Sequence, residues 1–125
     1  MSSQLSLISN FISAYNSFSI DEMLSSVHPD IHFKNISNDV VNVATSGKDE
    51  FEKLARQSAG LFSEREQKII SVTESGSKVF VEIKYTAVLA VDFPDGPKAG
   101  ERIEMNGKSE YEFKDGLIFS ITDES

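Results

Sequence analysis

The sequence predicts an α+β fold, with helices gathered on one face of a curved antiparallel sheet. Helical hydrophobic periodicity is confined to the first half of the chain, whereas period-two alternation dominates the second half. The alternation is clearest between Arg102 and Phe113, where one face is apolar or small and the other is charged or polar. A length of 125 residues with 39% hydrophobic residues suffices for one packed core, so we expect a single domain over residues 1–125.

Two helices are expected at the start of the chain. Apolar residues recur every three or four positions across residues 4–17, which indicates an amphipathic helix. A second, short helix should begin at the capping-box pattern of Ser19 and Glu22. We expect this helix to bury Val27 and to end at His28-Pro29, because helical backbone is disfavoured before a proline.

A strand pair and a longer helix complete the first half. Residues 31–36 are predicted to form a short strand, and the valines near residues 40–43 offer it a partner. The long helix is expected from about residue 47 to residue 62, where apolar residues again recur at helical spacing. Ser46 is the expected N-cap of this helix.

The second half is predicted to be a meander of long strands. Residues 67–74 and 79–91 should pair through a two-residue turn at Gly76-Ser77. Continued without interruption, this register places Ile70 opposite Ile83, so that the two apolar faces agree.

The last two strands are expected to meet at a Lys114-Asp115-Gly116 turn. If these three residues form the loop, Phe113 pairs with Leu117, and Gly116 supplies the left-handed residue that such a hairpin needs. Leu117, Phe119, Ile121 and Asp123 would then all share the inward face.

The expected outer face of the sheet is partly apolar. Phe80, Val88 and Ala90 lie opposite in phase to the inward residues of the long strand 79–91. Helices can cover only one face of this sheet, so we expect the outer face to contact a second subunit and the chain to form a homodimer.

Charge and composition exclude several functions. The net charge of −8 and the isoelectric point of about 4.7 argue against binding to nucleic acid or to an anionic membrane. There is no cysteine, and no glycine-rich phosphate loop is evident, so no cofactor is expected. The start of the chain lacks a basic segment followed by an apolar run, and we therefore expect a cytoplasmic location.

Four segments, in this order, resemble a known family. They are FISAYNSFSIDEM at residues 11–23, VHPDIHF at 27–33, SGKDEFEKL at 46–54 and YEFKDGLIFSITD at 111–123. Together they resemble the nuclear-transport-factor-2-like superfamily, which includes SnoaL-like proteins and ketosteroid isomerases. The resemblance implies a cystatin-like cone with a pocket between sheet and helices, and a dimer formed through the outer face of the sheet.

The resemblance also suggests where chemistry would occur. The catalytic positions of ketosteroid isomerases correspond here to Phe11, Asn35 and Ser109, none of which offers the expected tyrosine or carboxyl group, so we expect no steroid isomerase activity. The acidic residue that polyketide cyclases carry on the last strand corresponds to Asp123. A carboxylate on an apolar face should have a raised pKa and could act as acid or base, although a residue this close to the chain end could equally be solvated.

The inward phase of the predicted elements defines a candidate ligand pocket. Tyr15, on the apolar stripe of the first helix, would need a hydroxyl partner if buried, and Asn35 or Ser109 could supply it. Plain core packing is the alternative for each tyrosine. The expected lining residues are Phe11, Tyr15, Phe33, Asn35, Tyr85, Ser109, Tyr111 and Asp123.

The two histidines are an alternative site. His28 and His32 are four residues apart, a spacing that binds zinc on a helix. Pro29 interrupts such a helix and no third ligand is evident, so we expect no metal. The phase of residues 31–36 turns His32 away from the pocket, and a surface position is favoured for His28.

Three functions remain open from the sequence. The first is the binding of a small hydrophobic organic ligand in the conical pocket. The second is an isomerase, cyclase or dehydratase in which Asp123 is the acid or base and Asn35 and Tyr15 orient the substrate. The third is a protein-interaction or dimerisation module, which would have an occluded pocket.

Overall fold

The computed structural model describes residues 3–94 and 96–125. It contains the predicted order of helices followed by long strands, and none of the described helices has the length and hydropathy needed to cross a membrane. The elements are α1 (Ser3–Asn16), α2 (Ile20–Ser25), β1 (Val27–Ser37), β2 (Val40–Ser46), α3 (Lys48–Ala59), β3 (Phe62–Ser75), β4 (Lys78–Leu89), β5 (Arg102–Lys114) and β6 (Leu117–Glu124).

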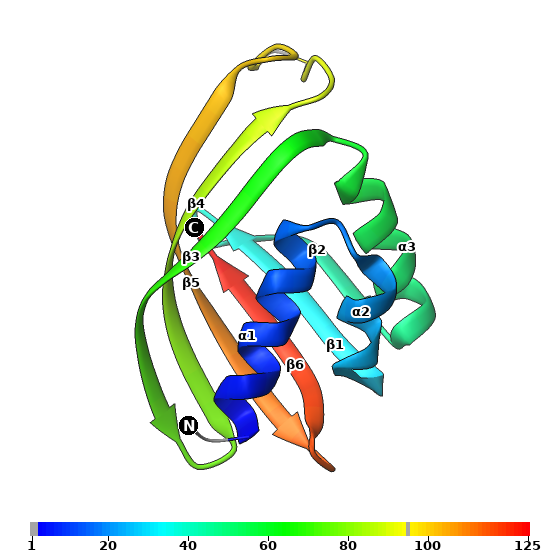
Figure 1. Ribbon diagram of the computed structural model, residues 1–125, viewed down its shortest axis with the longest axis vertical. Coiled ribbons are helices and arrows are strands. Elements are labelled where there is room, and N and C mark those ends of the chain that lie inside the picture. The colour runs from blue at the N-terminus through cyan, green and yellow to red at the C-terminus, as the bar shows by residue number, and fades with distance from the viewer. Residues whose placement is uncertain (1–2, 95) are drawn as a thin grey trace.

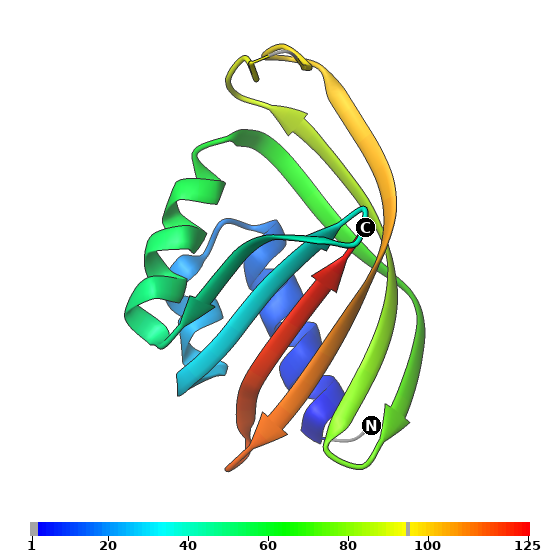
Figure 2. The same ribbon diagram turned by 180° about the vertical axis from the view of Figure 1, so that it is seen from behind.

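The six strands form one curved, unclosed sheet in the order β2-β1-β6-β5-β4-β3. Neighbouring strands are antiparallel, except that β1 and β6 pair in parallel. In Figure 1, α1 and α2 lie in front of the strands and α3 lies beside them at the right, whereas the strands lie in front of α1 in the view from behind in Figure 2. The helices therefore cover one face of the sheet, as the sequence predicts.

The second helix ends earlier than expected. It stops at Ser25, and Val27 already belongs to β1, where it pairs with Ile118 and is 1% exposed. The backbone N–H of Ile118 donates to the carbonyl of Ser26 at 3.0 Å. Pairing with β6 therefore provides the backbone hydrogen bonds that a longer helix would have made, and Pro29 lies within the strand. Ser19 precedes the helix as predicted but forms no side-chain capping bond.

The third helix is also shorter at both ends than expected. Its N-cap is Gly47, with a φ of 90°, rather than Ser46. The backbone N–H of Ser46 instead donates to Oε1 of Glu50 at 3.0 Å, so the helix start is stabilised by an acidic residue in its first turn. The helix ends at Ala59, and Phe62 begins β3.

The β3–β4 hairpin has the predicted turn but not the predicted register along its whole length. Ser75 pairs with Lys78 across Gly76-Ser77, as expected. Ile70 is the additional residue of a β-bulge, so Ile69, rather than Ile70, pairs with Ile83. Beyond the bulge, the residues of β3 that face the helices have odd numbers, which turns Arg65 and Gln67 inward.

The β5–β6 turn differs from the prediction. Lys114 pairs with Leu117, so the loop has two residues, and Asp115 and Gly116 both have positive φ, 54° and 76°. A bulge at Phe119 then shifts the register, and Asp123 lies opposite Ser109. Uninterrupted pairing from a three-residue loop would have placed Asp123 opposite Gly107 instead.

The bulge also changes which residues of β6 face the core. Ile118 is fully buried, whereas Leu117 and Phe119 are partly exposed and do not belong to the inward face. The ring of Phe119 packs edge-on against the rings of His28 and His32, with centroids 5.3 and 5.4 Å away. Only the second half of the expected inward set of β6, Ile121 and Asp123, is therefore placed as predicted.

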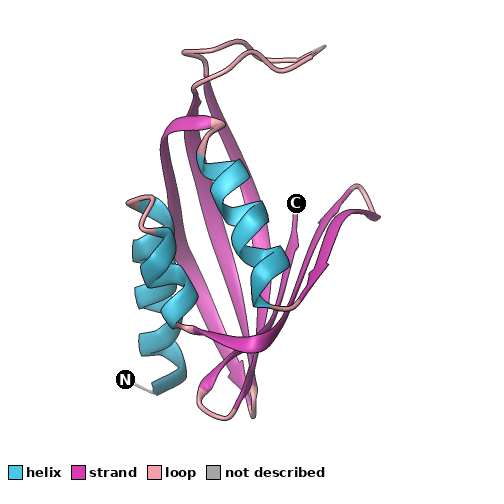
Figure 3. Cartoon of the chain, turned by 90° about the vertical axis from the view of Figure 1, so that its right-hand side faces the viewer, coloured by secondary structure: helices cyan, strands magenta, loops and turns pink. Residues whose placement is uncertain are grey.

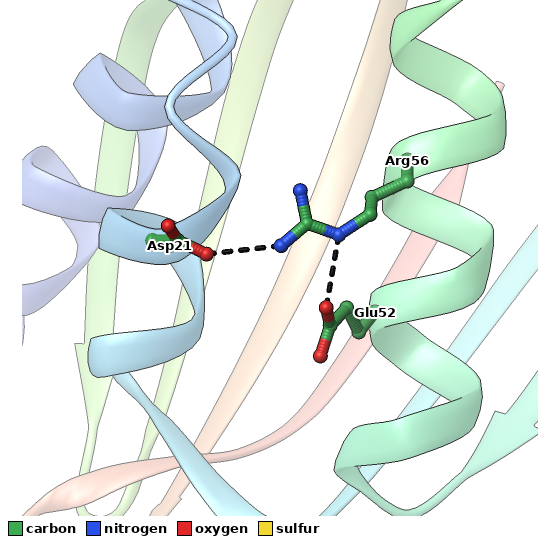
Figure 4. A network of polar contacts seen from close by, with 3 residues as sticks. All are labelled: Asp21, Glu52 and Arg56. Carbon is green, nitrogen blue, oxygen red and sulfur yellow. Dashed lines mark hydrogen bonds and ion pairs between the residues drawn. The ribbon is translucent and has the colours of Figure 1, made fainter.

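An exposed ion-pair network joins two of the helices. Arg56 on α3 donates through Nη2 to Asp21 on α2 and through Nε to Glu52, each at 2.9 Å (Figure 4).

The loop between β4 and β5 projects beyond the sheet at the opposite end from the β3–β4 turn (Figures 1 and 3). The core lies between α1, α3 and the concave face of the sheet, and it becomes hollow toward Asp123.

Candidate functional site

Two adjoining hollows open between the helices and the sheet. The first has a volume of about 180 Å³ and the second about 310 Å³. They share Tyr15, Asn35, Ser58, Gln67 and Asp123, so these residues mark the passage between them. The remaining lining of the first hollow is mostly apolar: Phe11, Met23, Phe33, Val43, Phe51, Leu54, Ala55, Arg65, Tyr111 and Ile121.

Three neighbouring strands place polar side chains in one row. Asp123 on β6 pairs in register with Asn35 on β1 and with Ser109 on β5. Side chains that lie opposite each other on adjacent strands share a face of the sheet. The carboxyl group of Asp123 is therefore flanked by an amide on one side and a hydroxyl on the other.

The carboxyl of Asp123 is held in a low-polarity environment. Burial raises its pKa to about 6, and a hydrogen bond from Ser109 acts in the opposite direction. The hydroxyl of Ser109 donates to Oδ1 at 2.6 Å, the short distance typical of a charge-assisted bond. With a pKa near neutrality, Asp123 can both accept and release a proton, which is the property of a general acid or base.

The tyrosines of the pocket are coupled to one another. The hydroxyl of Tyr15 is hydrogen-bonded to that of Tyr85 at 2.9 Å, and not to Asn35 or Ser109 as expected. Burial raises the pKa of both phenols above the ordinary value, so both stay protonated at neutral pH. One of the two hydroxyls donates within the pair, and the hydrogen of the other remains free to reach a ligand.

Arg65 is the buried cation of this region. It is 5% exposed, and its Nε donates to the backbone carbonyl of Tyr15 at 2.8 Å. Its guanidinium carbon lies 3.7 Å from the ring centroid of Tyr15 and 4.4 Å from that of Phe18. Burial lowers the pKa of Arg65 from its ordinary value, but a guanidinium stays charged at neutral pH.

The residues expected to line a ligand pocket are distributed unevenly over the two hollows. Tyr85 borders the second hollow rather than the first, and Ser109 borders neither, because it lies 2% exposed behind Asp123. Arg65 and Gln67 line the first hollow but were not expected from the sequence, since the bulge that turns them inward has no recognisable sequence signal. The expected residues on the first hollow are Phe11, Tyr15, Phe33, Asn35, Tyr111 and Asp123.

The two histidines lie away from the hollows. His28 Nε2 lies 3.4 Å from a carboxylate oxygen of Asp115, and His32 Nδ1 lies 3.4 Å from the hydroxyl of Ser46. No cluster of three or more acidic or histidine side chains is arranged to hold a metal ion within residues 3–94 and 96–125. The chemistry available in the pocket itself is proton transfer by Asp123, with hydroxyl, amide and guanidinium donors nearby.

Comparisons with known proteins agree on the family and the fold. A family model for the SnoaL-like domain matches residues 8–121. A candidate polyketide cyclase from Xanthomonas campestris pv. campestris is 20% identical, with a TM-score of 0.83 over 98% of this chain and 90% of that one. An LEH-like epoxide hydrolase from M. tuberculosis is also 20% identical, with a TM-score of 0.78 over 98% of this chain and 81% of that one.

A third solved structure extends the same likeness. IdmH, a candidate polyketide cyclase from Streptomyces antibioticus, is 14% identical, with a TM-score of 0.77 over 94% of this chain and 88% of that one. No curated protein shows detectable sequence similarity to the chain. At identities this low, the structural matches establish the shared fold, and the site must be interpreted from its own residues.

Proposed function

The chain belongs to the SnoaL-like domain family, and on that premise we propose that it binds a small, mostly apolar organic ligand in the hollow beside Asp123. The observation that carries this proposal is an unfilled, largely apolar space with a few convergent polar groups at one end. An apolar cavity of about 150 Å³ is known to hold a benzene ring. The first hollow, of about 180 Å³, fits one ring, and the second gives room for a substituent or a further ring.

Native mass spectrometry tests this proposal. We expect the purified protein to carry, or to take up from a library of ring compounds, one small molecule that is released on denaturation. Ala55 is 8% exposed and lines the first hollow, so Ala55→Phe should fill the space and abolish uptake. The matched control is Ala44→Phe, which adds the same ring at an exposed position on β2. Equal uptake by the two variants would place the ligand elsewhere.

A second function, acid–base catalysis on the bound ligand, is favoured by the raised pKa of Asp123. The reaction would be an isomerisation, cyclisation or dehydration in which Asp123 takes a proton from carbon or donates one to a leaving oxygen. Asn35 on the sheet and Tyr15 on α1 also line the hollow and would orient the substrate. Asp123→Asn should then lower turnover by at least a hundredfold while leaving ligand binding nearly unchanged. Unaltered turnover in this variant would exclude the catalytic role.

We also propose that the outer face of the sheet forms a homodimer. Phe80 is 42% exposed on that face, and Val88 shares its phase on β4. The remaining positions of the face are mostly charged, so the interface would be more polar than a protein core. A purely protein-binding module receives less support, because it was expected to have a filled pocket and the hollow is open.

A further inference from the structure

The one buried arginine of this chain is also the one that has no carboxylate partner among the described residues. Of the three arginines in the sequence, Arg56 pairs with Asp21 and Glu52, and Arg102 pairs with Glu104. Both of these are solvent-exposed, where an ion pair contributes little. Arg65 is 5% exposed, yet no carboxylate among the described residues lies within ion-pair distance of it. In a chain with a net charge of −8, this arrangement is unexpected.

The fold supplies only part of what a buried guanidinium needs. Tyr15 accepts one hydrogen bond from Nε of Arg65, and the carbonyl end of α1 favours a nearby cation. The rings of Tyr15 and Phe18 hold the guanidinium plane through cation–π contact. Phe18 takes a φ of 60°, which is strained for a bulky residue, to place its ring there.

Four of the five guanidinium N–H groups of Arg65 have no acceptor within residues 3–94 and 96–125. A guanidinium carries one N–H on Nε and two on each Nη. Both Nη atoms of Arg65 are closed to bulk solvent and have no hydrogen-bond partner among the described residues. Leaving buried donors without acceptors is costly, so an acceptor from outside the described residues would stabilise this wall of the pocket.

The first hollow is where such a partner would lie. It is lined by Arg65, Gln67 and Asp123, and its remaining lining is mostly apolar. No ion pair joins Arg65 and Asp123. Both side chains line this hollow, so a ligand in it lies beside both of them.

Building on the proposed ligand-binding function, we propose that Arg65 is the anion-binding residue of the pocket. The ligand is then a small, mostly apolar ring compound that carries one anionic oxygen group, a carboxylate or an ionised enol. Both Nη atoms are closed to solvent in the present arrangement, so the guanidinium has to shift toward the hollow for contact. A planar group of this kind then accepts two hydrogen bonds from the two Nη atoms together. A phosphate dianion fits less well, because there is one cation here and Asp123 opposes further negative charge.

Matched probe pairs test the inference by isothermal titration calorimetry. Benzoate and benzamide have nearly the same shape but differ in charge, and the ionised enol of cyclohexane-1,3-dione has cyclohexanone as its neutral counterpart. We expect the wild-type protein to bind the anionic member of at least one pair tenfold or more tightly than the neutral member. The pair that shows this preference identifies the anionic group as carboxylate or enolate. Equal affinities within both pairs would overturn the anion-binding role and leave the ligand-binding function standing.

Variants of Arg65 distinguish recognition of the anionic ligand from a purely structural role of this arginine. Arg65→Met keeps the length and apolar contacts of the side chain, and should abolish the preference for the anion while benzamide still binds. Arg65→Lys should restore part of the preference, because it keeps the charge without the planar fork. Arg56→Met, at an exposed arginine, should alter neither affinity. If Arg65→Met does not fold, the wild-type pairs and Arg65→Lys decide the question. Failure of every probe to bind would overturn this inference, whereas the Ala55→Phe comparison tests the proposed function separately.

Discussion

Asp123 destabilises the folded chain at neutral pH, and its pKa gives the sign of the effect. The pKa is raised from 3.8 to about 6, so the folded state binds the proton more tightly than the unfolded state does. Stability from this group is fully present below the unfolded pKa and is lost as the pH rises through about 6. The loss at pH 8 is on the order of 2 kcal/mol, reduced from the full shift because the side chain is only partly buried.

Asp123→Asn should therefore stabilise the protein at pH 8 and leave it unchanged at pH 4. The amide keeps an acceptor for the hydroxyl of Ser109 but carries no charge. Urea unfolding at the two pH values measures the difference, with an expected gain of about 2 kcal/mol at the higher pH only. Glu124→Gln, an exposed carboxylate on the same strand, is the control and should show no such change between the two pH values. An equal effect of Asp123→Asn at both pH values would contradict the raised pKa.

At the scale of the elements, the sequence predicts the strands better than it predicts their register. Hydrophobic alternation places Phe33, Asn35 and Tyr111 on the inward face because it depends only on period two, and these residues line the hollow. A bulge adds one residue without a clear sequence signature and exchanges the two faces beyond it. Continued from the turn without the bulge at Ile70, the pairing of β3 would have turned Glu66 inward in place of Arg65 and Gln67.

The bulge at Ile70 is consequently a position where both substitution and deletion should be tolerated. The side chain of Ile70 is 59% exposed, so Ile70→Thr should change the free energy of unfolding by less than about 0.5 kcal/mol. Deletion of Ile70 removes only the unpaired residue, because Ile69 already pairs with Ile83 and Ser71 with Glu82, and Arg65 therefore stays on the inward face. We expect the deletion to lower the free energy of unfolding by less than about 1 kcal/mol, because no carboxylate is turned toward the core.

Chemical denaturation of the two variants checks this expectation. A shortened chain could also be destabilised by strain alone, so the control is deletion of Gly100, which lies in the exposed loop between β4 and β5. That loop lies outside the sheet ladder and should tolerate the change with little loss. A loss of more than about 3 kcal/mol on deletion of Ile70, with the Gly100 deletion tolerated, would show instead that the deletion turns the carboxylates of β3 toward the core.

At the scale of the whole molecule, the unclosed sheet leaves two faces with different roles. Three helices cover the concave face and leave the hollow beside Asp123. The position of this hollow follows from two bulges and a two-residue turn rather than from any motif. The outer face has no covering element among the described residues (Figure 2). The family resemblance and the fold class could be predicted because they depend on the order of elements, whereas the pairing of Asp123 with Ser109 could not.

The uncovered outer face leads to a prediction about the oligomeric state of the protein. If two copies pack through it, Phe80 lies in the interface, and Phe80→Asp should convert a dimer into a monomer by placing like charges in contact. Sedimentation velocity at about 50 µM protein measures the change, and Ile70→Asp is the control because it adds the same charge to another exposed apolar position. A wild-type monomer at this concentration would exclude the proposed dimer. A dimer that survives Phe80→Asp but dissociates with Ile70→Asp would move the interface to the β3 edge of the sheet.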